Sequence, residues 1–138
     1  MKRRVLFLCT ANSCRSQMAE GIANHLFGDR VQAFSAGTEA SFVHPLAVEV
    51  LKEIGVDISQ QQSKNLSVFD GQSFDEVITL CGGANETCPL YIGGVKRRHR
   101  GFDDPAKAAG AGEEVLREFR RVRDEIKEML MTLLSGKA

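Results

Sequence analysis

The chain has 138 residues, which is the size of one compact domain. Eighteen Lys and Arg residues balance eighteen Asp and Glu residues, so the formal net charge is zero and no overall positive field attracts nucleic acid or an anionic membrane. Its apolar runs are too short for a membrane span, and we expect a single soluble domain over residues 1–138.

The N-terminal part of the sequence predicts a strand, a loop and a helix, followed by a second strand. Residues 5–8 form a continuous apolar run, typical of a strand that is buried on both faces of a parallel sheet. Apolar residues then recur every four positions over residues 18–27, which predicts an amphipathic helix that ends at Gly28. Residues 31–35 form the second predicted strand.

The rest of the chain continues the alternation of strands and helices. The further predicted elements are a helix from Pro45 to Gly55, a short helix over residues 66–69, strands over residues 77–80 and 99–102, and a helix over residues 114–134. Strands that alternate with helices indicate right-handed crossovers and a parallel sheet. The predicted fold is therefore an α/β single three-layer domain, a four-stranded parallel sheet flanked by helices.

The loop between the first strand and the first helix has the features of an oxyanion site. Backbone N–H groups in such a loop can turn inward, and the helix N-terminus adds partial positive charge. Arg15 can offer a planar fork to two oxygens of a tetrahedral anion. The loop residues predicted to bind the oxyanion are Thr10, Ala11, Asn12, Ser13, Cys14, Arg15 and Ser16.

Cys9 begins this loop and is the candidate nucleophile. The positive field that holds the anion would also favour a thiolate at Cys9. Ser13 and Ser16 can donate a hydroxyl to its sulfur, and Asn12 can fix the loop through a side-chain bond or a left-handed conformation. The alternative is that Cys9 is a buried apolar residue and Arg15 a surface charge. Cys14 is interpreted as a small core residue.

Two further cysteines follow another predicted strand. Carboxyl ends of parallel strands share one edge of the sheet, so Cys81 is expected near Cys9. Cys88 lies seven positions after Cys81, with two glycines between them. Three thiols at one edge suggest a relay in which one thiol passes its oxidation to the next. A zinc site made of the four cysteines and an ordinary loop thiol at Cys88 are the alternatives.

Two further polar features of the sequence are a candidate acid and a basic segment. Pro105 restrains Asp104 to an extended conformation, from which its carboxyl group can protonate a leaving oxygen; capping of a turn is the alternative role. Residues 96–100 form a basic run that gives local positive potential to an anionic substrate or a docking partner. The zero net charge, single Tyr and absence of Trp argue against nucleic-acid binding.

These residues together resemble the thioredoxin-coupled arsenate reductases, which share the low-molecular-weight protein tyrosine phosphatase fold. The resemblance covers nearly the whole chain, and Cys81 and Cys88 distinguish the reductases from the phosphatases. The matching segments are Phe7-Leu8-Cys9-Thr10, Asn12-Ser13-Cys14-Arg15-Ser16-Gln17-Met18-Ala19-Glu20, Ser35-Ala36-Gly37, Thr79-Leu80-Cys81, Cys88-Pro89, Gly101-Phe102-Asp103-Asp104-Pro105-Ala106 and Arg121-Val122-Arg123-Asp124-Glu125-Ile126.

The resemblance implies a role for each catalytic residue. Cys9 attacks arsenate, Arg15 and the loop amides hold its oxygens, and Asp104 protonates the departing hydroxide. Cys81 then attacks the Cys9 sulfur and arsenite leaves. Cys88 then forms a disulfide with Cys81, and thioredoxin reduces that disulfide. The resemblance further implies a cytoplasmic monomer that acts in arsenic detoxification, with no bound cofactor or metal and no nucleic-acid or membrane partner.

The chain departs from the family pattern at two positions. Some members bind potassium through an Asp where this chain has Lys64, together with positions that match Asn12, Glu20 and Ser35. We predict that the Lys64 ammonium group takes the place of the cation and forms a hydrogen bond toward Glu20. Ala11 stands where Gly is frequent, so its backbone must tolerate a Cβ.

Two other functions remain open at this point. A phosphotyrosine phosphatase would use the same loop, but Ala106 follows Pro105 where such phosphatases usually carry an aromatic residue. Residual phosphatase activity is still expected, because arsenate and phosphate share shape and charge. A noncatalytic thiol switch or arsenite-binding protein would use the same cysteines.

Overall fold

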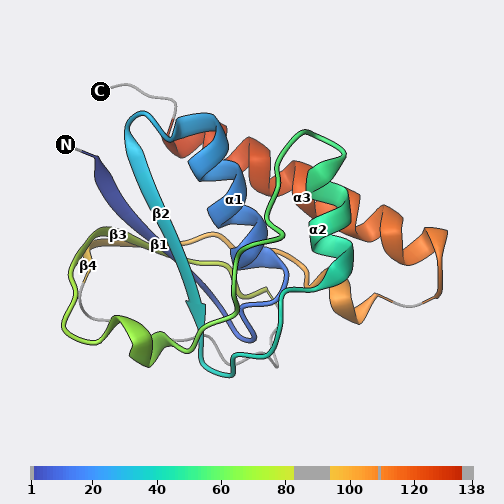
Figure 1. The fold of residues 1–138 in the computed structure, drawn as a ribbon, viewed down its shortest axis with the longest axis horizontal. Coiled ribbons are helices and arrows are strands. Elements are labelled where there is room, and N and C mark those ends of the chain that lie inside the picture. Colours follow the sequence, from blue (N-terminus) through green and yellow to red (C-terminus); the bar gives the residue numbers. More distant parts are fainter. Residues whose placement is uncertain (1, 83–93, 109, 135–138) are drawn as a thin grey trace.

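The computed structural model describes residues 2–82, 94–108 and 110–134. Its elements follow one another in the alternating order that the sequence predicts (Figure 1). They are β1 (Arg3–Cys9), α1 (Arg15–Phe27), β2 (Val31–Gly37), α2 (Pro45–Lys52), the 3-10 helix η1 (Leu66–Phe69), β3 (Phe74–Thr79), β4 (Gly94–His99), the 3-10 helix η2 (Pro105–Lys107) and α3 (Glu113–Leu134).

The four strands form one parallel sheet in the order β2-β1-β3-β4. Strand β1 pairs with a neighbour on each side, and residues 5–8 are fully buried. The continuous apolar run is thus confirmed as a central strand that both faces of the sheet cover. Because the strands are parallel, β1, β2 and β3 all end at the same edge.

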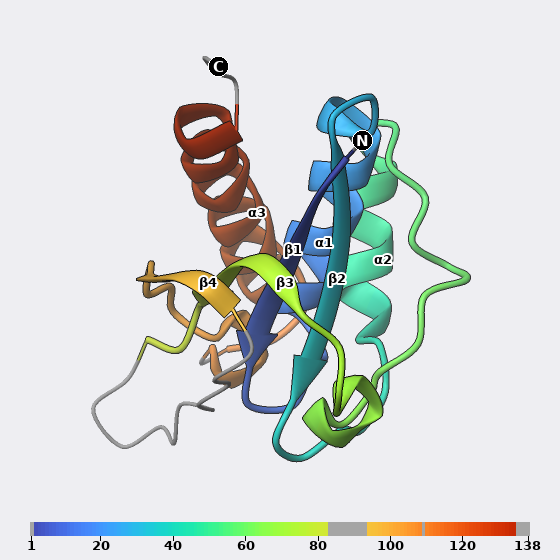
Figure 2. The same ribbon diagram turned by 90° about the vertical axis from the view of Figure 1, so that its left-hand side faces the viewer.

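Different elements cover the two faces of the sheet. On one face, Phe7 and Ile78 belong to a core cluster with residues of α1, α2 and α3, and these three helices lie together behind the sheet in Figure 2. On the other face, Leu6 and Leu8 pack with Phe69 of η1. The three layers are therefore three helices, the sheet and a covering segment around η1.

Strand β4 is displaced from its predicted position. It spans Gly94–His99 rather than residues 99–102. Lys96 and Arg97 of β4 are exposed. Strand β4 lies at the edge of the sheet and pairs with β3, so it needs few apolar side chains and shows no apolar pattern. Charged side chains on such an edge also disfavour pairing with other chains. Arg98 of β4 forms an ion pair with Glu76 of β3.

The helix ends agree more closely with the sequence pattern. Helix α3 begins one residue before its predicted start and ends at Leu134, as expected. Helix α2 ends at Lys52, three residues before Gly55, which adopts a φ of 81° in the turn that follows. A residue without a Cβ tolerates that left-handed conformation. An ion pair links α3 to the end of α2, with 2.9 Å between Arg123 Nη1 and Glu53 Oε1.

No helix in residues 2–82, 94–108 and 110–134 combines the length and apolar character that crossing a membrane requires.

Candidate active site

The predicted oxyanion loop joins β1 to α1 at the carboxyl edge of the sheet, and Cys9 is its first residue. The Cys9 side chain is buried, and its Sγ lies 2.8 Å from Ser16 Oγ. Ser13 instead contacts Cys14, with 3.6 Å between Oγ and Sγ. Of the two hydroxyls that the sequence offered, Ser16 therefore contacts the candidate nucleophile, Cys9.

Asn12 sets the shape of the loop. It is fully buried and is the one non-glycine residue with positive φ, 50°, in the part of the chain that the structure describes. Its Nδ2 donates to Ser16 Oγ at 2.7 Å, and its Oδ1 accepts the backbone N–H of Lys64 at 2.8 Å. Both predicted devices, the side-chain bond and the left-handed conformation, are confirmed. Ala11 has no positive φ, so its Cβ causes no strain.

Ser16 links Asn12 to the Cys9 sulfur. Its Oγ accepts a hydrogen bond from the Asn12 amide and lies within hydrogen-bond distance of Cys9 Sγ. A hydroxyl group has one hydrogen and two lone pairs, so Ser16 can donate to a Cys9 thiolate or accept from a Cys9 thiol. The loop thus brings the candidate nucleophile and a hydroxyl group together in a buried setting.

Arg15 is buried at the start of α1 and is held from the far side of the loop. Its Nη1 donates to the carbonyl oxygens of Leu80 at 3.4 Å and Phe102 at 3.2 Å. Its Nη2 lies 3.6 Å from a carboxylate oxygen of Asp104. The guanidinium group is therefore oriented before any anion binds, which lowers the entropy cost of holding one.

Asp104 caps a turn, the alternative role that the sequence left open, and also lies beside Arg15. Its backbone is extended, with φ −84° and ψ 106°, as expected for a residue before Pro105. One carboxylate oxygen accepts the N–H of Ala106 at 3.1 Å and caps η2, while the other faces Arg15. The carboxyl group is thus fixed beside the group that would hold the anion.

Cys14 is a core residue, as the sequence suggests. It is buried and belongs to the cluster beneath α1. Burial raises the pKa of its thiol to about 12, despite a hydrogen bond from Ser13 that acts in the opposite direction. At neutral pH it stays protonated and a poor nucleophile.

The second cysteine reaches the same edge of the sheet. The N–H of Leu80 donates to the carbonyl of Leu8 at 2.8 Å, which continues the β1–β3 pairing beyond the last ladder residue. Residues 80–81 therefore run beside residues 8–9, and Cys81 is buried next to the start of the loop. Cys88 lies outside the described residues.

Gly82 follows Cys81 at a point where no side chain fits. A Cβ there would lie 2.1 Å from the carbonyl oxygen of Phe102. A Cβ at Gly101 would lie 2.9 Å from the carbonyl oxygen of Cys81. The two glycines let the backbone of residues 101–102 pass directly against the Cys81 segment, which brings Asp104 to the same edge.

The positions equivalent to the family cation site lie beneath the loop. Ser35 Oγ donates to Glu20 at 2.5 Å, and Lys64 Nζ donates to the carbonyl of Gln62 at 2.8 Å, not to Glu20 as predicted. Burial raises the pKa of the Glu20 carboxyl group, while the Ser35 bond and the Lys64 charge lower it. Lys64 therefore acts on Glu20 through its charge.

We expect potassium to have little effect on this protein, because a fixed ammonium charge already acts on Glu20. Exchange of sodium for potassium at constant ionic strength should leave the melting temperature unchanged in differential scanning calorimetry. The matched variant Lys64→Asp, which removes that charge, should gain a potassium-dependent rise. A clear rise with the natural chain would contradict the expectation.

Four residues around the loop were not predicted from the sequence. Gln17 bonds to Asn12, and Gln61 bonds to Gln17. His44 caps α2 through its Nδ1, and its ring stacks on exposed Phe42. The only available signal was the position of Gln17 directly after the oxyanion loop. The contacts of the other three depend on tertiary structure.

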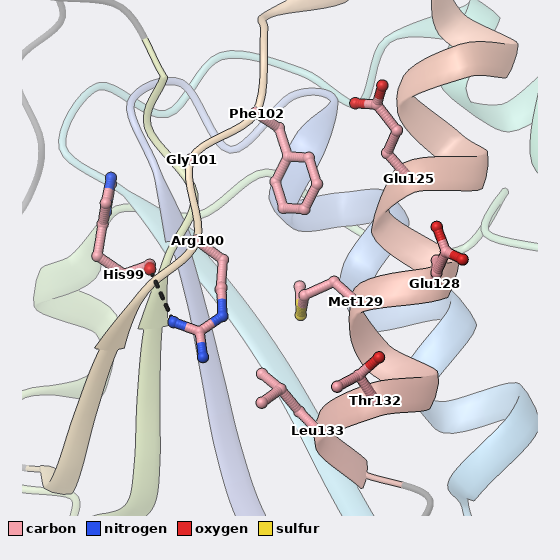
Figure 3. Close-up of a pocket in the computed structure, with 9 residues that line it drawn as sticks. All are labelled: His99, Arg100, Gly101, Phe102, Glu125, Glu128, Met129, Thr132 and Leu133. Atoms are coloured by element: carbon pink, nitrogen blue, oxygen red, sulfur yellow. Dashed lines mark hydrogen bonds between the residues drawn. The ribbon is translucent and has the colours of Figure 1, made fainter.

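A groove of about 600 Å³ lies beside the loop rather than at it (Figure 3). It separates Arg100 and Phe102 from the C-terminal half of α3. Met129 and Leu133 supply apolar surface, and the described lining includes no cysteine. No residue of the oxyanion loop lines this groove, and the candidate site is the loop itself, where Arg15 and Asp104 lie close to each other.

Comparison with known proteins agrees with this geometry. Residues 4–137 match the low molecular weight phosphotyrosine protein phosphatase family. The chain belongs to that family. An arsenate reductase of Shouchella clausii is 51% identical over 125 residues, which cover 91% of this chain and 90% of the relative. The family match over residues 4–137 includes both the Cys9 loop and the Asp104 segment.

Two solved structures resemble the chain closely. An arsenate reductase in the phosphate binding state superposes with a TM-score of 0.82 at 37% identity, with 98% of each chain covered. A thioredoxin-dependent arsenate reductase of Corynebacterium glutamicum superposes with a TM-score of 0.64 at 31% identity, over 98% of this chain and 64% of that one. The predicted four-stranded phosphatase-like fold is confirmed.

Proposed function

We propose that this family member is an arsenate reductase that reduces arsenate to arsenite through a relay of Cys9, Cys81 and Cys88. The observation that carries the proposal is the continued pairing of Leu80 with Leu8, which sets Cys81 beside the anion loop that begins at Cys9. Arsenate reductases 51% identical to the chain support the substrate.

The first step is attack of the Cys9 thiolate on arsenic(V). The backbone N–H groups of the loop and the Arg15 guanidinium group hold the arsenate oxygens. An As–S bond forms and an As–O bond breaks, while Asp104 gives a proton to the departing oxygen, which leaves as water. The fixed contact between Asp104 and Arg15 keeps the acid close to the anion.

The second step transfers two electrons to arsenic. The Cys81 thiolate attacks Cys9 Sγ, an S–S bond forms, and the electron pair of the As–S bond stays with arsenic, which leaves as arsenite. Cys88 then attacks Cys81 Sγ and releases Cys9 as a thiolate. The Cys81–Cys88 disulfide is the oxidised product, and a dithiol must reduce it before the next cycle.

Thioredoxin is the proposed reductant. The Corynebacterium glutamicum structure is of a thioredoxin-dependent arsenate reductase, which supports this partner. The chain itself needs no bound cofactor or metal for the steps above, since thiols carry all of the electrons. The reduced resting state of three thiols fits a reducing compartment such as the cytoplasm.

Hydrolysis of aryl phosphates is a second candidate activity, and the residues Phe42 and His44 favour it. Phe42 is exposed and stacks on His44, with 6.1 Å between the ring centroids. The backbone N–H of His44 donates to the carbonyl of Ser13 in the loop. An aromatic surface beside the loop can contact the ring of an aryl phosphate.

A coupled assay separates the candidate functions. Arsenate, thioredoxin, thioredoxin reductase and NADPH are supplied with catalytic amounts of the protein. A reductase consumes NADPH over many turnovers, while a thiol switch or an arsenite-binding protein consumes at most one equivalent per protein. A phosphatase releases phosphate from p-nitrophenyl phosphate without NADPH. Absence of repeated NADPH turnover with arsenate would overturn the proposed function.

A further inference from the structure

Gln17 is a fully buried amide in the first turn of α1 that contacts the loop from behind. Its Nε2 lies 3.1 Å from Asn12 O, 2.9 Å from Asn12 Oδ1 and 2.9 Å from Gln62 O. All three partners are oxygen acceptors, so the NH2 end of the amide must face them. Neither Gln17 nor these contacts belong to the chemical steps described above.

The contacts hold the residue with the strained conformation. Asn12 has a φ of 50°, which is unfavourable for a residue with a Cβ. Gln17 binds its backbone carbonyl and its side-chain carbonyl together, so the backbone and the amide plane of Asn12 are fixed relative to each other. With Oδ1 held in this way, Nδ2 points to Ser16 Oγ.

A second amide fixes the orientation of Gln17. Gln61 Nε2 donates to Gln17 Oε1 at 2.7 Å and to the Gln17 carbonyl at 3.1 Å. Gly21 permits this approach, because a Cβ there would lie 2.3 Å from Ile58 and 3.3 Å from Gln61 Oε1. A continuous series of hydrogen bonds therefore runs from Gln61 through Gln17, Asn12 and Ser16 to the Cys9 sulfur.

We propose that Gln17 is a positioning residue for the Cys9 loop, acting through Asn12 and Ser16, with Gln61 as its support. The amide of Gln17 keeps Asn12 in its left-handed conformation, which preserves both the curl of the oxyanion loop and the contact between Ser16 and Cys9. This inference rests on Cys9 being the nucleophile of the proposed function. It does not depend on arsenate being the substrate.

The test uses Gln17→Met, which keeps the length of the side chain and removes its hydrogen bonds. The matched control is Asn24→Leu, because the Asn24 amide also bonds α1 to neighbouring backbone, through Ala33 N and O, far along the helix from the loop. Two readouts need no arsenate: the affinity for inorganic phosphate by calorimetry, and the alkylation rate of Cys9 by iodoacetamide, followed by peptide mass spectrometry.

We expect Gln17→Met to weaken phosphate binding about tenfold and to slow alkylation of Cys9 by a similar factor, the size of one lost hydrogen bond. Asn24→Leu should lower the melting temperature and change neither readout. A melting-temperature loss in Gln17→Met with unchanged phosphate affinity and Cys9 reactivity would show a purely structural role and overturn the proposal.

Gln61→Met keeps the proposal testable if Gln17→Met does not fold. It removes the outer support while Gln17 and Asn12 retain their side chains, so we expect about a threefold effect on both readouts, in the same direction. Wild-type values for both would overturn the inferred series of contacts. Failure of the coupled NADPH assay with normal phosphate binding would instead count against the proposed function alone.

Discussion

Replacement of Cys88 by Ser is expected to abolish steady-state turnover of arsenate, while each enzyme molecule still releases one arsenite. Cys9 and Cys81 suffice for the electron transfer to arsenic, so the first cycle reaches the Cys9–Cys81 disulfide. Without the third thiol that disulfide stays beneath the loop, where Cys9 and Cys81 are both buried. Rapid quench and arsenite quantification would show a burst of one equivalent without a steady state.

Two further substitutions define the order of the relay. Cys81→Ser should release no arsenite, because the thiol that attacks Cys9 is absent. Cys14→Ser is the matched control: burial raises the pKa of the Cys14 thiol to about 12, so it takes no part and turnover should persist. A Cys88→Ser enzyme that turns over repeatedly, or one that releases no arsenite at all, would contradict the proposed order.

Local patterns in the sequence predicted most of the fold. The run over residues 5–8 is apolar because β1 is buried on both faces, and the stripe over residues 114–134 is apolar because α3 packs against α1 and α2 in the core. Strand β4 was misplaced because its signal is different. Its residues are basic, and an edge strand whose Arg98 pairs with a buried Glu76 shows no apolar alternation.

The site was predictable as far as chain order and parallel pairing determine it. A strand, a loop and an Asp-Pro pair share one edge of the sheet. This predicts that three side chains lie at that edge, those of Cys9, Arg15 and Asp104. Gln17 and Gln61 were missed because their contacts join positions 44 residues apart in sequence. Lys64 was predicted to form a hydrogen bond toward Glu20, but its ammonium group donates to the nearby carbonyl of Gln62 instead.

The conservative substitution Arg15→Lys should reduce kcat/KM for arsenate by about a hundredfold to a thousandfold, the range seen when one oxyanion donor is removed. Lysine carries the same charge, but its ammonium group cannot supply two parallel N–H donors to two oxygens. It also loses the contacts of Nη1 with Leu80 and Phe102 that orient the guanidinium group before the anion binds.

A second buried arginine provides the control for the loss of packing and of hydrogen bonds when arginine is replaced by lysine. Arg123 of α3 donates to the carbonyl of Val50 at 2.9 Å and to Glu53 at 2.9 Å, on the side of the molecule where α2 meets α3. Arg123→Lys should lower the free energy of unfolding by about 2 kcal/mol in urea titration, with kcat/KM unchanged. If Arg15→Lys loses stability to the same degree yet keeps wild-type kinetics, the guanidinium group does not hold the anion. A kinetic loss confined to Arg15→Lys would instead place the fork geometry, rather than positive charge alone, at the centre of oxyanion binding.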